Sequence, residues 1–253
     1  MQTKMMRISP AFTRIELVMV IVATAIIAVL VSMLLPAFLP AKHGKSTHPT
    51  CINNLKEIGT GYRLWAGDNG DLMPFQQSVS RHGWKELLTN ANQGAICWTN
   101  YALMQNELGQ SPKLVVCPDD KRLPGASFTS NFDNTHVSYF VGVGASDIYP
   151  QSILGGDRNL GPGTAPDAEY GYSPKSGKGN DVAVPLSGPV SWSLKMHSGG
   201  NPSGAGRILL GDGSAQQVSS AMLNQNWLRN AAPTTNWPAG HIPSSPSIRV
   251  LFP

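Results

Sequence analysis

The chain has 253 residues, enough for one packed domain with appendages or for two small domains. The net charge is +4, and the Lys and Arg residues are scattered rather than clustered. Without a basic stripe, the sequence does not favour a nucleic-acid-binding protein. An apolar fraction of 41% and an aromatic fraction of 8% exclude wholesale disorder, and 26 Gly with 20 Pro indicate many turns.

The most apolar part of the chain is residues 17–35, in which only Thr24 and Ser32 are polar. Both hydroxyls can bond to carbonyl groups of their own helix. A helix from Phe12 to about Pro36 would be roughly 36 Å long, which is enough to span the apolar core of a bilayer. Because proline interrupts or kinks helices, we expect the helix to change direction or end at Pro36.

Two simpler readings of this N-terminal segment compete. An ordinary signal peptide has a shorter apolar run, and a cut after Ala41 would follow Leu39-Pro40, a poor match to the small residues such a site needs. A plain membrane anchor explains the length but not the carboxylate of Glu16 at the edge of the run. Such a carboxylate costs on the order of a few kcal/mol unless it is paired or reaches the interface.

The stretch AFTRIELV, residues 11–18, follows a short basic leader and opens the apolar run. This combination resembles the prepilin processing signal of type IV pilins and type II secretion pseudopilins. The resemblance implies a cut by prepilin peptidase between Ala11 and Phe12 and methylation of the new Phe12 amine. It also implies that Glu16 pairs with the Phe12 amine of a neighbouring subunit during assembly. The chain departs from the family at Ala11, where Gly is usual, and at Arg14, where an apolar residue is usual.

A second helix is predicted at about residues 49–66. Its apolar residues recur at steps of three and four and form one stripe: Cys51, Leu55, Ile58, Tyr62 and Trp65. This spacing is typical of an amphipathic helix, and we interpret the stripe as core.

Three further elements resemble a subgroup of bacterial pilin-like proteins. They are the segment CINNLKEIG from Cys51, the element Cys117-Pro118-Asp119-Asp120, and His197 followed by Asp212-Gly213. The gap between His197 and Asp212 is longer than is usual in that subgroup. In a pilin, the helix that begins near Cys51 would be the outer half of one long first helix packed on the head.

The remaining sequence predicts a mixed head. Short helices are expected at 84–89, 97–108 and 220–231, and strands at 114–117, 137–144, 191–197, 207–210 and 215–218. The strands 191–197 and 207–210 are expected to pair or to be neighbours, with a tight turn before 215–218. We expect a long surface loop at about 155–190 and a loosely attached tail in which 248–252 adds an edge strand.

The predicted fold class is therefore α+β, with a long N-terminal transmembrane helix that continues into a pilin-like globular head with a small antiparallel sheet. The predicted segments are a leader (1–11), a transmembrane and assembly helix (12–40), the head (41–231) and a Pro-rich tail (232–253).

Candidate chemistry outside the N-terminal signal is sparse. The three cysteines have no CxxC spacing, so either two of Cys51, Cys97 and Cys117 form a disulfide or all three are buried thiols. No metal-ligand spacing is visible. Calcium is the one cofactor considered, with Asp68 and Asp71 as candidates, although Asp also commonly forms turns.

His197 and Asp212 could form an acid–base pair, but GDGSA does not fit a nucleophile elbow, and GxGxxG and P-loop motifs are absent. We expect a structural subunit rather than an enzyme. The expected partners are prepilin peptidase, other pilin-like subunits, an inner-membrane assembly platform and membrane lipid, with no nucleic acid.

The expected location is the bacterial inner membrane, with a single span, a cytoplasmic N-terminus and a periplasmic or extracellular head. A pilus and a type II secretion pseudopilus fit equally. Two alternatives stay open: a membrane-anchored module that binds a glycan or an exported substrate, and an anchored hydrolase.

Overall fold

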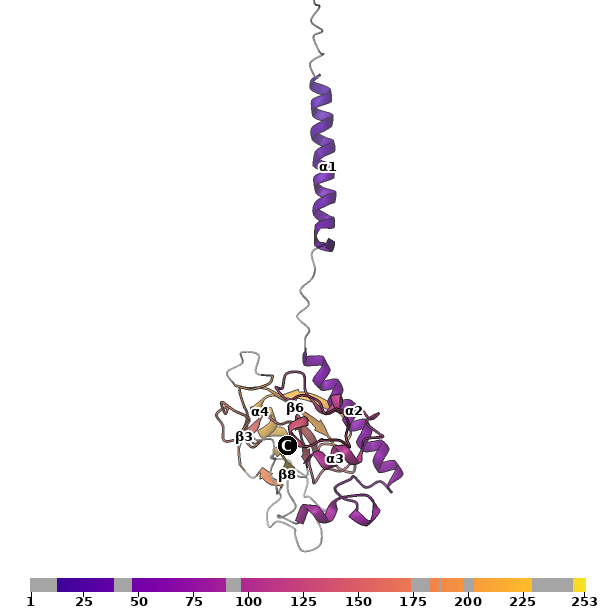
Figure 1. The fold of residues 1–253 in the computed structure, drawn as a ribbon. Helices are drawn as coiled ribbons and strands as arrows, with labels where there is room; N and C mark the ends of the chain where they lie inside the picture. The colour runs from indigo at the N-terminus through magenta and orange to yellow at the C-terminus, as the bar shows by residue number, and fades with distance from the viewer. Residues whose placement is uncertain are drawn as a thin grey trace, which may run out of the picture. The chain divides into compact units, whose positions relative to one another are not determined.

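The computed structural model describes residues 13–38, 47–89, 97–173, 183–186, 188–197, 203–228 and 248–253. The chain divides into two compact units, Met1–Lys45 and Ser46–Pro253 (Figure 1).

The first unit contains the helix α1 (Arg14–Phe38), whose 25 residues extend about 37 Å. The hydroxyl of Thr24 donates to the carbonyl oxygens of Val20 and Ile21, each at 2.9 Å, as expected. The side chain of Ser32 lies outside the described residues. The helix ends at Phe38, two residues past Pro36, which agrees with the predicted end at about Pro36. A proline so near the end of a helix removes only its own backbone hydrogen bond, so the last turn persists.

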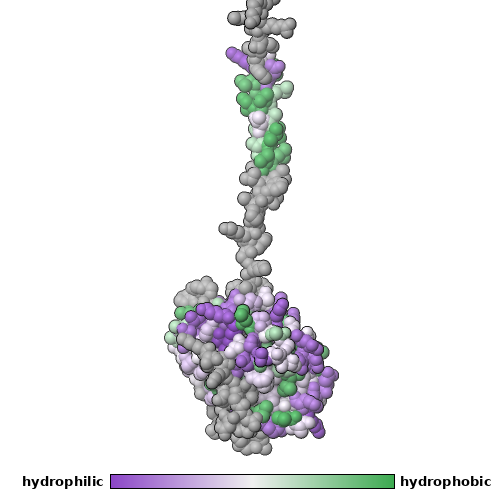
Figure 2. Space-filling view, viewed as in Figure 1, coloured by the Kyte–Doolittle hydropathy of each residue, from purple (hydrophilic) through white to green (hydrophobic). Residues whose placement is uncertain are grey.

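The apolar side chains of α1 are exposed along the helix, and Figure 2 shows those on the face in view. They include Ile15, Leu17, Val18, Met19, Val20, Ile21, Val22, Ile26, Ile27, Val29, Leu30 and Val31. Within the described residues, α1 is the one helix long and apolar enough to cross a membrane. A helix that is apolar all round is unstable in water and needs lipid or other helices around it.

The second unit is built from short elements and one long helix. Its helices are α2 (Thr47–Asp68), α3 (Cys97–Leu103) and α4 (Ser220–Met222), followed by a π-helical turn η5 (Leu223–Leu228). Its 3-10 helices are η1 (Val79–Arg81), η2 (Lys85–Thr89), η3 (Pro112–Val115) and η4 (Asn134–His136). The strands are β1 (Tyr139–Gly142), β2 (Ile153–Asp157), β3 (Leu160–Pro162), β4 (Val184–Leu186), β5 (Val190–Trp192), β6 (Gly206–Leu210), β7 (Ala215–Val218) and β8 (Ile248–Leu251).

Six of these strands form one antiparallel sheet in the order β4-β8-β1-β2-β6-β7, and β3 pairs with β5 in a second, two-stranded sheet. The register places Tyr139 opposite Asp157 and Ile208 opposite Gln216. Mixed helices and an antiparallel sheet confirm the α+β class.

The central sheet is covered on both faces because its strands alternate side chains between two apolar clusters. On β1, Tyr139 and Val141 belong to the cluster under α2, whereas Phe140 belongs to the opposite cluster. On β6, Leu209 belongs to the cluster under α2 and Ile208 to the opposite cluster. Successive side chains of a strand point to opposite faces, so the pattern follows directly from strand geometry.

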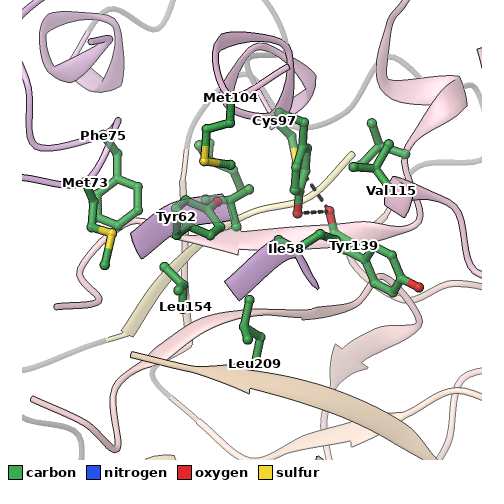
Figure 3. Packing of buried hydrophobic residues seen from close by; sticks show 14 of the residues in the cluster. Ile58, Tyr62, Met73, Phe75, Cys97, Met104, Val115, Tyr139, Leu154 and Leu209 are labelled. Carbon is green, nitrogen blue, oxygen red and sulfur yellow. Dashed lines mark hydrogen bonds between the residues drawn. The ribbon is translucent and has the colours of Figure 1, made fainter. Parts of the chain in front are cut away.

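Helix α2 covers the first face with the apolar stripe that its sequence predicts, and it lies along one side of the head (Figure 1). All five stripe residues are buried, and Ile58 and Tyr62 lie among Phe75, Leu154 and Leu209 (Figure 3). The interpretation of this stripe as core is therefore confirmed. The junction that would make α1 and α2 one helix lies outside the described residues.

The second face is covered by β3, β5 and the C-terminal helical turns. Trp192 of β5 packs on Gly206, where an added Cβ would lie 2.3 Å from the indole ring. Leu223 and Trp227 belong to the same cluster, as does Phe252 next to the C-terminus. The ring of Phe252 also stacks on Tyr172.

Some predicted elements of the head are confirmed. The strand at 137–144 is present as β1, the turn and return strand after residues 207–210 form β7, and a helical segment begins at Ser220. Of the predicted helix at 84–89, residues 85–89 form a 3-10 helix, and the helix from Cys97 ends at Leu103, where turns replace it.

Other predictions are wrong. Residues 112–115 form a 3-10 helix, which Pro112 starts, and not a strand. The loop predicted at 155–190 contains the end of β2, all of β3 and β4, and the first residue of β5. Strands β5 and β6 lie in different sheets and do not pair. The segment 248–252 does form a strand, but β8 lies inside the sheet between β4 and β1, not at its edge.

Candidate functional site

The first candidate site is the start of α1. The carboxylate Oε2 of Glu16 accepts hydrogen bonds from the backbone N–H and the hydroxyl of Thr13, both at 2.9 Å. The backbone N–H of Glu16 in turn donates to the Thr13 hydroxyl at 3.3 Å. This reciprocal pattern is a capping box, in which two helix-starting N–H groups gain partners. Ala11 and Phe12, the predicted processing residues, lie outside the described residues.

The capping box gives Glu16 a local role. It satisfies one carboxylate oxygen at the edge of the apolar helix, and the helix N-terminus further favours a negative charge there. The Thr-x-x-Glu spacing of residues 13–16 is the sequence signal for this motif, and the sequence reasoning above overlooked it. The recorded bonds of the carboxylate involve Oε2, so the cap is compatible with a further partner for Glu16.

The second candidate site is a buried cluster in the head around a disulfide. Cys51 in the first turns of α2 is bonded to Cys117, which follows η3, with Cα atoms 5.3 Å apart. The bridge closes a sequence separation of 66 residues. Cys97 is the remaining cysteine and is a buried free thiol that donates to the carbonyl oxygen of Tyr139 at 3.5 Å. Burial raises the pKa of the Cys97 thiol well above its usual value.

His197 lies against this disulfide and is fully enclosed. Its Nε2 lies 3.3 Å from Sγ of Cys117, and its Nδ1 lies 2.6 Å from Oδ2 of Asp119. Asp157 faces Nε2 as well, with Oδ2 at 3.1 Å, and Nη1 of Arg207 touches the same nitrogen. Thus one imidazole joins a sulfur atom, two carboxylates and a guanidinium.

The charges of this cluster are buried. Asp157 and Arg207 are 0% exposed, and the backbone N–H of Arg207 donates to Oδ2 of Asp157 at 2.8 Å. Burial opposes the charged form of His197, but the charges of Asp157 and, more weakly, Asp119 outweigh it and raise the pKa of the imidazole. A protonated His197 would donate to both carboxylates.

The other residue of the CPDD element, Asp120, forms a separate ion pair. Nε and Nη2 of Arg158 bind its two carboxylate oxygens at 2.6 and 2.8 Å, and Ser138 donates its hydroxyl to Oδ2 at 2.8 Å. The guanidinium of Arg158 also lies over the ring of Tyr170, 3.5 Å from its centroid. These contacts tie the segment after Cys117 to β1 and to the chain just after β2.

The remaining pattern-based candidates are Asp212, Asp68 and Asp71, and calcium binding by the last two stays a prediction. The carboxylate of Asp212 accepts from the backbone N–H and hydroxyl of Ser214 in the turn between β6 and β7, whereas the carboxylates beside His197 are those of Asp119 and Asp157. Asp68 and Asp71 are exposed at the C-terminal turn of α2. In the described part of the chain, the side chains grouped closely enough to hold a metal ion are instead Cys51, Cys117, Asp119 and His197.

The sequence reasoning missed this cluster because its members come from five separate stretches of chain, at residues 51, 117–119, 157, 197 and 207. The two cysteines are 66 residues apart, and His197 is 80 residues beyond Cys117. The sequence signal for the cluster was the presence of CINNLKEIG, CPDD and His197 together. These three elements were interpreted as separate motifs and not as parts of one site.

Comparison of the chain with protein-family models, curated proteins and solved structures gives no match. The functional argument therefore rests on the residues and their geometry.

Proposed function

We propose that this chain is a pilin-like structural subunit, cut before Phe12 by prepilin peptidase and assembled through α1 into a type IV pilus-like filament or a type II secretion pseudopilus. Its N-terminus would lie in the cytoplasm and its head outside the inner membrane. The observation that carries the proposal is the exposed apolar surface around α1. A single carboxylate, that of Glu16, lies at the N-terminal end of this surface.

The apolar surface supports two successive environments for α1. In the membrane, lipid tails would surround it, and a helix of about 37 Å can span the apolar core. In a filament, the same side chains would pack against equivalent helices of neighbouring subunits. A helix with no polar stripe suits both environments, whereas a helix packed on its own head would need only one apolar face.

Glu16 supports the assembly step. A carboxylate that moves into a helix bundle loses water, and the loss is compensated only by a close cation. The new amine of Phe12 would be such a cation, because the cut generates it four residues before Glu16. Since the pair would be desolvated, a subunit lacking either charge would leave the other one buried and unpaired.

The disulfide and the polar surface of the head support the same proposal. The disulfide fixes the start of α2 to the segment after η3, and the apolar side chains of α2 are turned into the head. The visible face of the head is largely hydrophilic, as Figure 2 shows. A covalently fastened, water-compatible head is suited to an exported subunit.

The experiment separates the two roles of Glu16 with a matched pair of variants, expressed in a cell that has an assembly machinery. Glu16→Gln keeps an oxygen that can accept from Thr13 but removes the charge, whereas Thr13→Val removes the capping hydroxyl but keeps the charge. We expect both variants to insert in the membrane. We expect Glu16→Gln to reduce the sheared filament fraction at least tenfold, and Thr13→Val to change it less than twofold.

Wild-type filament levels from Glu16→Gln would contradict the charge pairing. A loss of filament from Thr13→Val with wild-type levels from Glu16→Gln would assign Glu16 to the helix cap alone.

A further inference from the structure

We propose that the head is a redox-dependent metal site, in which the dithiol form of Cys51 and Cys117 binds one borderline-soft divalent ion such as Zn²⁺ together with His197. This inference does not depend on filament assembly. It starts from the grouping of thiol, imidazole and carboxylate ligand atoms, all within 4.8 Å of one another.

The donor set fits this kind of ion. Thiolate and imidazole are the ligands that zinc prefers, and a tetrahedral zinc site holds its ligand atoms about 3.3–3.8 Å apart. Nε2 of His197 is already 3.3 Å from Sγ of Cys117. The two sulfur atoms of a disulfide are closer than zinc ligation allows, so the metal and the disulfide exclude each other.

Asp119 supplies the support that a metal-binding histidine needs. Its Oδ2 lies 2.6 Å from Nδ1 of His197, so it can accept the Nδ1–H and leave the lone pair of Nε2 for the metal. A carboxylate that orients the ligating imidazole in this way recurs in metal sites. The side chain of Asp119 is 19% exposed while that of His197 is 0% exposed, so the carboxylate is the member of the pair that reaches solvent.

An independent observation is the buried carboxylate of Asp157 beside the site. Asp157 is 0% exposed, and its Oδ1 is buried with no hydrogen-bond partner in the described structure. Because Oδ2 of the same carboxylate lies 3.1 Å from Nε2 of His197, Asp157 favours a further cation near this nitrogen. Because Nη1 of Arg207 touches Nε2 in the disulfide form, metal binding requires the guanidinium to turn away from this nitrogen.

Metal binding begins with reduction of the disulfide. A dithiol reductant transfers two electrons and two protons to the Cys51–Cys117 bond and becomes a disulfide itself. The metal then displaces the two thiol protons and forms two metal–sulfur bonds. A protein disulfide oxidant would reverse the process, and the ion would leave as the sulfur atoms join.

The test uses the full chain in detergent, reduced and then freed of reductant without oxygen, with Co²⁺ as the spectroscopic probe and Zn²⁺ as the competitor. We expect one Co²⁺ per reduced chain, with thiolate charge-transfer absorption that Zn²⁺ abolishes, and no uptake by the oxidised chain. Cys51→Ser and Cys117→Ser should lose the signal, and Asp119→Asn should weaken affinity about 10- to 100-fold. Cys97→Ala, which removes a cysteine outside the cluster, should bind normally.

Folding of each reduced chain is followed by circular dichroism, with and without Zn²⁺. Zn²⁺ should raise the unfolding temperature of the reduced wild type and leave that of Cys117→Ser unchanged. The proposal is overturned if the folded, reduced chain takes up no Co²⁺, if uptake survives loss of Cys51 or Cys117, or if a chain unfolded by reduction stays unfolded with Zn²⁺.

Discussion

Arg158 donates two hydrogen bonds to the carboxylate of Asp120, from Nε to Oδ2 at 2.6 Å and from Nη2 to Oδ1 at 2.8 Å. The two side chains are 5% and 0% exposed. The pair joins the segment after Cys117 to the end of β2, so it holds two parts of the head that are 38 residues apart. Arg–carboxylate pairs of this two-point geometry are among the stronger side-chain contacts in proteins.

Asp120→Asn should therefore destabilise the head markedly. It leaves the shielded guanidinium of Arg158 without its counter-charge, and breaking a buried pair from one side costs about 3 kcal/mol in free energy of unfolding. Asp133→Asn is the control, because Asp133 pairs with His136 at an exposed position and Asn still caps η4. Denaturant unfolding should show a loss below about 1 kcal/mol for the control. Equal losses would contradict the role of the Asp120 pair.

The same pair predicts acid sensitivity. Burial opposes ionisation of Asp120, but the hydrogen bonds and charge of Arg158 outweigh it and hold the pKa of the carboxyl below its usual value. Such a group binds protons more readily in the unfolded chain, so its stabilisation is complete above about pH 5 and is lost as the pH falls through the folded pKa. Unfolding curves should show the wild-type advantage over Asp120→Asn shrinking below about pH 4. An advantage independent of pH would show that the charge is not its source.

Gly59 and Gly67 of α2 provide a matched test of helix packing. A Cβ at Gly59 would lie 2.8 Å from Cδ1 of Leu209 and 3.0 Å from the backbone of Gly213, whereas nothing lies within 4 Å of one at Gly67. Gly59→Ala should cost about 1 kcal/mol or more, because α2 must move off the β6–β7 turn. Gly67→Ala should gain about 0.5 kcal/mol from helix propensity. Thermal unfolding of the two variants distinguishes these signs, and a stabilising Gly59→Ala would refute the close approach.

Cys97 should behave as an unreactive thiol. It is buried, and burial raises the pKa of its thiol, so the nucleophilic thiolate is scarce at neutral pH. In the oxidised protein, alkylation followed by mass spectrometry should give no modified cysteine in the native state and one, at Cys97, after unfolding. Peptide mapping without reduction should link Cys51 to Cys117. Rapid native alkylation, or a bridge that includes Cys97, would contradict the structure.

The sequence was most informative where one local pattern determined the structure. The steps of three and four from Cys51 to Trp65 gave α2 and its buried face, because an amphipathic helix needs only its own periodicity. The uninterrupted apolar run after Glu16 gave α1 for a similar reason. The Gly-Asp-Gly-Ser turn gave the β6–β7 hairpin, since the turn and the return strand are neighbours in the chain.

The errors arose where distant partners decide the structure. Gly155 and Gly156 looked like loop residues, but they lie in a central strand where an added Cβ at Gly156 would meet the carbonyl oxygen of Arg207 at 2.7 Å. The apolar run ending at Cys117 looked like a strand, although its burial comes from the disulfide and core contacts. No local signal could place β8 between β4 and β1, because its register depends on both partners.

The candidate sites also differ in how far apart their residues lie in the sequence. The Thr13–Glu16 cap was readable as Thr-x-x-Glu, because both residues lie in one turn of helix. The pairing of Cys51 with Cys117 and the position of His197 beside them were not readable, because three cysteines allow several pairings and the sequence gives no distance across the fold. The cluster became visible only when η3, β2 and the chain after β5 were brought together.

The most direct measurement is the mass of the N-terminal peptide of the protein purified from its native membrane. We predict a mature chain that begins at N-methylated Phe12, with residues 1–11 removed. This result would place a new cation four residues before Glu16 in every subunit. A chain that still begins at Met1, or one cut near Ala41 so that α1 is lost, would contradict assembly through α1.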